Sequence, residues 1–279
     1  MEMQALLEQA GFQLRSHQAL SGGDISEVHK LDTDQGLLVI KLNSAGRYPG
    51  MFEAEARGLL ALSDAGALKV PEVIVHGHFS DQAYLLLEYI ETNQPAPDFW
   101  EQLGVGLANI HQQSRDQFGL DHNNYIGSLD QPNANETTSS DFYLNQRLLP
   151  QVQLARNRGY TLHEFEVLAV RLPDLIPEEP PALVHGDLWG GNFMVGPQGQ
   201  PVLIDPAVAY APREMDFGMM HLFGGFDPRL FHAYQEAFPI SPGWRDRLEL
   251  WQLYYLLVHL NLFGGGYLDS VRRILKRYS

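Results

Sequence analysis

The residues with the clearest chemistry in this 279-residue chain are two aspartates and an asparagine at close spacing. Asp187 and Asn192 lie in the run HGDLWGGN, which is flanked by apolar residues, and Asp205 ends the next short apolar run. In kinases, one carboxylate accepts the proton of the attacking hydroxyl, while an Asn and a second carboxylate hold Mg²⁺ on the ATP phosphates. The pattern predicts a kinase centre with Asp187 as the base and Asn192 and Asp205 as magnesium ligands.

A structural interpretation of the same residues has to be weighed. Asp and Asn in glycine-rich loops are usually turn formers, because their side chains cap their own backbone. Asp187 on its own would be interpreted as a turn former. An ordinary hairpin does not need a His-Gly-Asp run, an Asn at this offset and a second Asp after the next strand. The whole pattern therefore favours phosphoryl transfer.

Composition excludes several classes of protein. The net charge of −15 argues against a nucleic-acid partner and is compatible with a cationic substrate. The chain has no cysteine, which excludes a disulfide framework, a thiolate metal site and a cysteine nucleophile. No secretory signal pattern and no membrane-length apolar run is visible. We expect a cytoplasmic enzyme with no membrane partner.

The elements that would position these residues fall into two groups. Strand-like runs dominate the first part, at 14–20, 28–31, 37–42, 71–75 and 83–90, with helical patterns at 2–10 and 51–64. After a proline-punctuated segment the helical patterns are 99–113, 142–158, 162–171, 228–237 and 242–262. We predict an α+β fold with a small mostly-β nucleotide-binding lobe, 1–90, and a larger mostly-α catalytic and substrate lobe, 91–279. The polar segment 130–140 is predicted to be an exposed loop.

Lys41 is the candidate for neutralising the ATP phosphates, because it lies in a β-rich run after a glycine turn. An exposed strand lysine is the structural alternative. In kinases a helix carboxylate pairs with the strand lysine and holds it over the phosphates. The helical pattern 51–64 offers Glu53 and Glu55. We expect Glu55 to be the partner, because it lies one turn before Leu59 beside the apolar stripe.

Two further segments are candidates for nucleotide contacts. Gly22 and Gly23 lie between two β runs, where backbone N–H groups could approach phosphate oxygens closely. Paired glycines are more often simple hairpin turns, and the chain has no Gly-Lys-Ser/Thr Walker sequence. Glu88 and Ile90 lie where the last strand of the small lobe meets the linker. We expect the backbone groups of this segment to bind adenine.

Taken together, nearly the whole chain resembles the fructosamine kinase, or ketosamine-3-kinase, family within the aminoglycoside-phosphotransferase-like kinases. The His-Gly-Asp core marks only the broad superfamily, whereas the segments 188–192, 222–226 and 261–264 are more specific. Other matching segments are 21–26, 39–41, 51–56, 85–88, 118–119, 204–207, 213–216 and 254–264.

The resemblance implies a protein-kinase-like two-lobe fold, the cofactors ATP and Mg²⁺, and a ketoamine substrate formed from a sugar and an amine or lysine side chain. Phosphorylation at the sugar's O3 would destabilise this adduct and free the amine, which is a deglycation repair activity. The sugar (fructosamine or ribulosamine) and the amine (free or protein-bound) stay open. Some members carry a loop cysteine that links two subunits. Asp24 and its neighbours offer none, so a monomer and a non-disulfide dimer both stay open.

Several neighbouring residues have more than one interpretation. Trp189, two residues after the predicted base, could stack on the sugar or anchor the loop in the core. Asp216 is expected to accept hydrogen bonds that brace the catalytic loop, and His185 to bond to backbone. His221 and His259 have no assigned role, because a packed helical histidine is the default.

Three functions are compatible with these residues: a ketosamine kinase, another small-molecule kinase acting on an aminoglycoside or choline, and a nucleotide-binding pseudokinase. The pseudokinase is disfavoured because the motif set is complete, with Lys41, Glu55, Asp187, Asn192 and Asp205. Charge does not separate the first two, since ketoamines and aminoglycosides are both cationic. A compact sugar needs a smaller cavity than a multi-ring aminoglycoside. We therefore expect activity on a ketoamine and little or none on kanamycin-type compounds.

Overall fold

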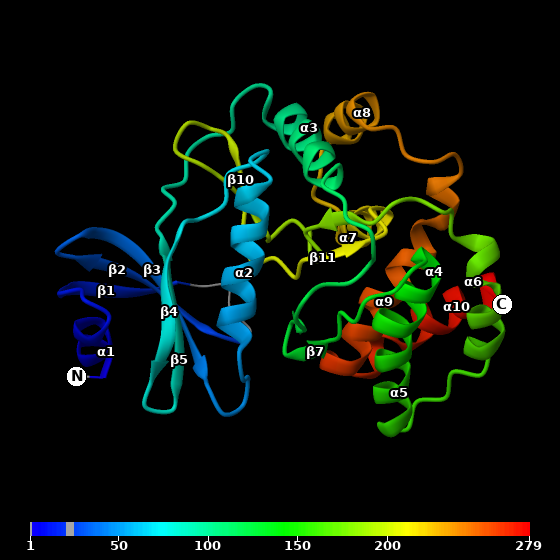
Figure 1. Cartoon of the computed structure of the whole chain (residues 1–279), viewed down its shortest axis with the longest axis horizontal. Helices are drawn as coiled ribbons and strands as arrows, with labels where there is room; N and C mark the ends of the chain where they lie inside the picture. Colours follow the sequence, from blue (N-terminus) through cyan, green and yellow to red (C-terminus); the bar gives the residue numbers. More distant parts are fainter. Residues whose placement is uncertain (1, 21–24) are drawn as a thin grey trace.

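Two lobes make up the molecule, as Figure 1 shows with the small lobe on the left and the larger lobe on the right. The structure is a computed structural model that describes residues 2–20 and 25–279. The N-terminal part forms an antiparallel sheet with two helices, and the rest of the chain is mainly helical. The predicted α+β class with a small β-rich lobe and a larger α-rich lobe is confirmed.

The small lobe is a five-stranded antiparallel sheet in the order β1-β2-β3-β5-β4. Its strands are β1 (Leu14–Leu20), β2 (Glu27–Thr33), β3 (Gly36–Ser44), β4 (Val73–Phe79) and β5 (Gln82–Glu88), with helices α1 (Glu2–Gln9) and α2 (Met51–Asp64). Side chains alternate between the two faces of a strand. On β5, Tyr84 and Leu86 pack into the cluster that contains α1, whereas Leu85 and Leu87 pack with residues of α2. Both faces of the central strands are therefore covered, which explains the continuous apolar run in the sequence.

The larger lobe contains α3 (Phe99–His111), α4 (Ser139–Phe142), the π-helical turn η1 (Tyr143–Leu148), α5 (Leu149–Asn157), α6 (Phe165–Leu175), α7 (Glu214–Phe223), α8 (Pro228–Ala237), α9 (Trp244–Phe263), the 3-10 turn η2 (Gly265–Tyr267) and α10 (Leu268–Tyr278). Short antiparallel pairs connect them: β6 (Asn124–Ile126) with β7 (Leu129–Gln131), β8 (Ala182–Val184) with β11 (Ala209–Ala211), and β9 (Phe193–Val195) with β10 (Pro201–Leu203).

Of the helices with ten or more residues in this lobe, α7 and α10 were not predicted from the sequence. Helix α7 is buried from Glu214 to Met220, so it lacks the polar face that marks an amphipathic helix. Helix α10 does show that pattern, with Val271, Ile274, Leu275 and Tyr278 buried. The last helix predicted from the sequence ends at residue 262, before this segment, so α10 was not predicted.

The segment 130–140 is only partly the exposed loop that its polarity suggested: Asp130, Ala134, Asn135 and Thr137 are exposed, but other residues are buried. Gln131, Asn133 and Ser139 are each 1% exposed, and part of the segment forms β7. Their polar groups are satisfied inside the protein: the Asn133 side chain, for example, donates to the His122 carbonyl and to Asn124. Buried polar side chains are tolerated where hydrogen bonds replace water, so composition alone gave the wrong prediction here.

One hydrophobic core continues across the junction of the lobes. It contains Phe52 and Leu59 of α2 and Leu85 of β5 together with Leu107 of α3 and Leu203 of β10. A backbone bond from the Leu203 N–H to the Lys69 carbonyl ties the same junction. The small lobe therefore sits on the hairpin that carries Asp205 and shares buried apolar surface with it.

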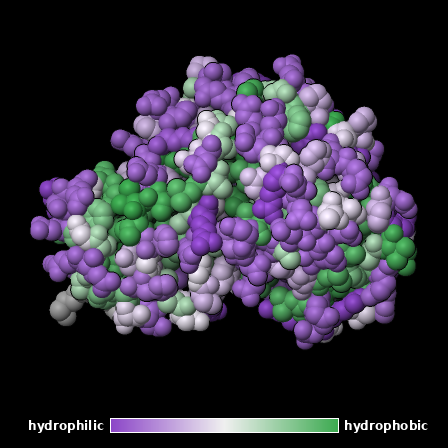
Figure 2. All heavy atoms as spheres, viewed as in Figure 1, coloured by the Kyte–Doolittle hydropathy of each residue, from purple (hydrophilic) through white to green (hydrophobic). Residues whose placement is uncertain are grey.

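The surface in the view of Figure 2 is mainly hydrophilic, with hydrophobic residues gathered over part of the small lobe and at the lower right of the large lobe. Among the helices of the described residues, none has the length and apolarity required to cross a bilayer.

Candidate phosphotransfer site between the lobes

The loop that follows β8 places Asp187 and Asn192 side by side. The Asn192 side-chain amide donates to the Asp187 backbone carbonyl at 2.8 Å and to its carboxylate at 3.1 Å. Gly186 has a φ of +83°, and a Cβ at this position would lie 2.1 Å from the Ala207 carbonyl oxygen. The glycine in the His-Gly-Asp run is thus required by a close approach between two loop segments.

Asp205 returns to the same place at the end of the β9–β10 hairpin. Its φ of +53° lies in the left-handed region, which is uncommon for residues other than glycine and is seen at functional sites. Its carboxylate accepts a hydrogen bond from the Lys41 ammonium group at 3.0 Å. Through this hairpin, Asp205 contacts Lys41 of the small lobe, although the two residues lie 164 positions apart in the sequence.

Lys41 is held by two carboxylates. Its Nζ lies 2.7 Å from Glu55 Oε1 and 3.0 Å from Asp205 Oδ1, and only 11% of its side chain is exposed. Burial alone would lower the pKa of Lys41, but the two neighbouring carboxylates outweigh it and raise the pKa above the usual value. The lysine is therefore a fixed positive charge. Glu53, by contrast, faces solvent and pairs with Arg57.

Asp187 is an unusual aspartate. Burial raises its pKa well above the ordinary value, the nearby Asp205 charge adds to this, and the Asn192 hydrogen bond opposes it. A higher pKa makes a carboxylate a stronger proton acceptor. Because Asp187 also lines the cavity between the lobes, it is suited to accept a proton from a hydroxyl group bound there.

The oxygen atoms present fit a magnesium ion. Asn192 uses its amide nitrogen on Asp187, which leaves the side-chain oxygen to face a ligand. Asp205 is bonded through one oxygen, and 45% of its side chain is exposed. No group of three or more His, Cys, Asp or Glu residues forms a metal cage within the described ranges. Magnesium does not need one, since it binds one or two protein oxygens and completes its shell with phosphates and water.

A set of buried hydrogen bonds, here called the brace, fixes the backbone of the loop that follows β8. It consists of Asp216, His111 and Tyr234. Asp216, which is fully buried, accepts the backbone N–H groups of His185 and Gly186, each at 2.8 Å. His111 at the end of α3 donates from Nε2 to the same carboxylate at 3.0 Å, and its Nδ1 contacts the Tyr234 hydroxyl. Burial would raise the pKa of Asp216, but the His111 contact and the backbone bonds lower it, so the carboxylate stays ionised.

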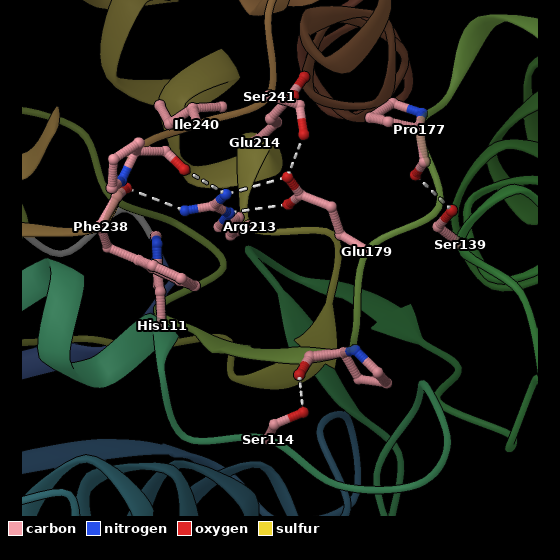
Figure 3. A network of polar contacts seen from close by, with 12 residues as sticks. His111, Ser114, Ser139, Pro177, Glu179, Arg213, Glu214, Phe238, Ile240 and Ser241 are labelled. Atoms are coloured by element: carbon pink, nitrogen blue, oxygen red, sulfur yellow. Dashed lines mark hydrogen bonds and ion pairs between the residues drawn. The ribbon is translucent and has the colours of Figure 1, made fainter.

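Arg213 anchors the brace in turn, because its guanidinium donates to the Tyr234 hydroxyl at 3.4 Å. Its guanidinium binds Glu179 through two nitrogens, at 2.7 and 2.9 Å, and donates to the carbonyls of Phe238 and Pro239. Figure 3 shows this arrangement, with Ser241 also donating to Glu179. A bidentate Arg–carboxylate pair with additional carbonyl partners is geometrically well defined.

A second set of buried bonds lies under the Asp205 side of the loop. Gln131 donates to the Ala207 carbonyl and to Asn124, and Asn124 donates to the Val208 carbonyl. The Tyr255 hydroxyl donates to the Gly186 carbonyl at 3.0 Å. Gln131, which was expected to lie in an exposed loop, thus supports the segment that follows Asp205.

A cavity of about 930 Å³ opens between the lobes and joins these groups. Its lining includes Lys41, Glu55, Asp187, Asn192 and Asp205. Trp189 also lines it and is 43% exposed, so the tryptophan does not anchor the loop in the core.

Other residues singled out from the sequence lie as follows. Gly22 and Gly23 fall outside the described residues, although the adjoining Ile25 and Ser26 line the cavity. The lining, as far as the chain is described, does not include Glu88 or Ile90. The Glu88 carboxylate binds Lys69, which leaves only backbone groups of this segment for a ligand.

The histidines have local partners. His185 contacts the Ile204 carbonyl through Nε2, as expected for a backbone partner. His221 and His259 each donate from Nδ1 to the carbonyl one helical turn earlier, on Phe217 and Tyr255. His259 also lines the cavity.

Several supporting residues were missed from the sequence. His111, Gln131, Asn124, Arg213 and Tyr255 act on the loop across long stretches of chain, for example 105 residues between His111 and Asp216. No local spacing marks such contacts. A polar residue in an apolar pattern, such as His111 at the end of an apolar helix, is the one available signal.

A strand lysine paired with a helix carboxylate, facing an Asp-Asn-Asp loop between a β-rich and a helical lobe, defines a phosphotransferase of the protein-kinase-like fold. The chain belongs to the fructosamine kinase family, whose model matches residues 2–279. It is therefore a kinase of that family.

Relatives that align over most of both chains support this assignment. A probable ketoamine kinase of Enterococcus faecium is 41% identical, over 92% of this chain and 93% of the relative. The ketosamine-3-kinase of Mus musculus is 32% identical, over 92% of this chain and 93% of its own.

Solved structures show the same architecture. A putative fructosamine-3-kinase from Thermobifida fusca aligns with a TM-score of 0.87 and 32% identity, covering 98% of this chain and 96% of its own. An aminoglycoside phosphotransferase in a ternary complex with AMP-PNP and hygromycin B aligns with a TM-score of 0.62 and 16% identity, over 99% and 98% of the chains. The second likeness concerns the fold alone.

Proposed function

We propose that the protein is an ATP- and Mg²⁺-dependent ketoamine kinase that phosphorylates O3 of a sugar joined to an amine. The observation that carries the proposal is the single cavity in which the Lys41–Glu55–Asp205 contact meets Asp187 and Trp189. Relatives named as ketoamine and ketosamine-3-kinases support the substrate class.

The residues divide the chemistry between them. Lys41, fixed by Glu55, neutralises the nucleotide phosphates. Asn192 and Asp205 would hold Mg²⁺, which offsets the negative charge of the phosphates when it is bound. Backbone groups near Glu88 and Ile90 would bind adenine, and Gly22 and Gly23 would cover the phosphates.

Asp187 accepts the proton of the sugar hydroxyl while that oxygen attacks the terminal phosphorus and ADP leaves. Trp189 packs against the sugar and helps to orient it. A phosphate at O3 is a better leaving group than a hydroxyl, so the adduct decomposes and frees the amine. This sequence of events would amount to a deglycation repair activity.

The decisive experiment is ATP consumption by the purified protein with a panel of a ribulosamine, a fructosamine, an aminoglycoside of the kanamycin type and choline. We expect turnover of at least one ketoamine, with the phosphate located on O3 by NMR, and little or none with the other compounds. Much faster turnover of an aminoglycoside than of either ketoamine would refute the proposal.

A further inference from the structure

The mouth of the cavity collects the exposed aromatic side chains of the molecule. Among the described residues, only three Phe, Tyr or Trp side chains are exposed: Trp189 at 43%, Phe223 at 45% and Phe263 at 59%. All three line the same cavity, although they come from segments far apart in the sequence. Large apolar side chains are rarely left gathered in water without a ligand to cover them.

Two of these residues belong to a continuous group of rings, here called the aromatic platform: Phe223, His259, Phe263 and Tyr267. The His259 ring lies 5.0 Å from Phe223, 5.5 Å from Phe263 and 5.2 Å from Tyr267, measured between ring centroids. Because the His259 Nδ1–H is donated to the Tyr255 carbonyl, the ring is held in one orientation. The platform is therefore a preformed surface, one side of which faces the cavity.

The platform also lies where two helices end. Helix α7 ends at Phe223 and α9 at Phe263, and each is followed by a glycine with positive φ, Gly224 at 70° and Gly264 at 91°. Helix C-termini carry a partial negative charge. The last turn of α9 contains no basic residue to offset it. A cation is therefore favoured at this mouth, both by the end of α9 and by the ring faces.

We propose that the aromatic platform binds the amine side of the substrate, namely the protonated secondary amine and the apolar or aromatic substituent that it carries. The inference rests on the proposed function and deepens it. In a ketoamine the nitrogen is separated from the reacting C3 by only C1 and C2. A sugar with O3 at Asp187 and its ring at Trp189 thus directs the nitrogen and its substituent along the same cavity toward Phe223 and Phe263.

The proposal predicts which amines are preferred. The lysine stem, a benzyl group or a long alkyl chain covers the rings, whereas a methyl group does not reach them. Since Phe263 is mostly exposed, the substituent can continue into solvent, and a large amine does not have to fit inside the cavity. The platform favours long or aromatic amines over short ones and does not act on the sugar itself.

The test uses one sugar that the wild-type protein phosphorylates, attached in turn to methylamine and to benzylamine. In Phe223→Ala and Phe263→Ala we expect the KM of the benzylamine adduct to rise about tenfold, whereas the KM of the methylamine adduct, which loses only the contact of its cation with the rings, should rise about threefold. The kcat of both adducts and the KM of ATP should stay within about twofold. Val170→Ala serves as the control, because Val170 on α6 is 81% exposed and does not line the cavity.

The charge requirement is tested with an analogue in which an ether oxygen replaces the nitrogen of the benzylamine adduct. We expect its KM with the wild-type protein to be about tenfold higher, since the cation is lost. An equal KM for the two compounds would overturn the cationic part of the proposal.

Each remaining outcome is also informative. An equal rise in KM for both amine adducts would overturn the binding of the substituent to the platform, and a rise in the KM of ATP would assign the platform to the nucleotide. Both results leave the ketoamine kinase intact, because turnover of the adducts continues. Absence of wild-type turnover with every ketoamine would instead refute the proposed function and the platform with it. A thermal unfolding scan of each variant excludes misfolding as the cause.

Discussion

The two halves of the site are built in different ways. The small-lobe half is a charge contact between Lys41 of β3 and Glu55 of α2, which lie fourteen residues apart and have side chains that are only 11% and 13% exposed. The large-lobe half is a loop whose backbone is fixed from beneath by Asp216, His111 and Tyr255. The first half depends on two side chains and the second on a buried scaffold. Substitutions in the small-lobe half should therefore affect catalysis more than stability, whereas those in the scaffold should affect catalysis and stability together.

The largest effects on activity are expected from substitutions of Asp187 and Asp205. Asp187→Ala should lower kcat about 10³-fold, because the proton acceptor is lost. Asp205→Ala should lower kcat to a similar degree and also weaken binding of Mg²⁺-ATP, which Asp187→Ala should leave largely intact. Titration calorimetry with Mg²⁺-ATP separates the two variants. Equal loss of nucleotide binding would show that the roles are assigned wrongly.

Removing the small-lobe charge comes next. Lys41→Met should raise the KM of ATP and lower kcat, together by about 100-fold in kcat/KM, because the phosphate contact acts in the ground state and in the transition state. Steady-state kinetics with varied ATP measures this. Lys41→Met kinetics identical to wild type would reduce the lysine to an ordinary strand residue.

The scaffold is tested with Asp216→Asn. The substitution turns an acceptor of two backbone N–H groups and of His111 into a partial donor, which we expect to cost about 3 kcal/mol of unfolding free energy and about tenfold in kcat. Urea unfolding and kinetics on the same sample provide both values. A variant with reduced kcat and unchanged stability would contradict the contrast between the two halves.

The smallest effects separate two neighbouring glutamates on α2. Glu55→Gln should raise the KM of ATP about fivefold. Glutamine has the size of glutamate and can still accept a hydrogen bond from Lys41, but the attraction between opposite charges is lost. Glu53→Gln should change neither kinetics nor stability by more than about 0.5 kcal/mol, because the Glu53–Arg57 pair is exposed. The two variants form a matched pair on one helix. Similar kinetics in both would argue against a role of Glu55 in positioning Lys41.

The same contrast explains what the sequence could predict. Helices 51–64 and 228–237 were predicted with the observed bounds, and the motif residues came together, because each depends on local periodicity or on a short strand–loop–strand unit. The Lys41–Glu55 pair followed from one strand and the next helix.

The supporting residues could not be found in this way. Gln131 and Asn133 look like loop residues until their partners are known, and those partners lie in other segments, such as the Ala207 carbonyl and Arg147. Helix α7 lacks a polar face because the protein surrounds it. Tertiary contacts decide these cases, and a single sequence does not display them.

The hydrophobic core that continues across the lobe junction has a consequence for how the molecule holds together. Phe52 and Leu59 from one lobe and Leu107 and Leu203 from the other bury each other, so each lobe would expose part of its buried apolar surface when separated. We therefore expect one cooperative unfolding transition for the whole chain and early proteolysis of either lobe expressed alone. For the same reason, a chimaera that joins the small lobe of one relative to the large lobe of another should fold only if the core residues on both sides of the junction are taken from the same relative.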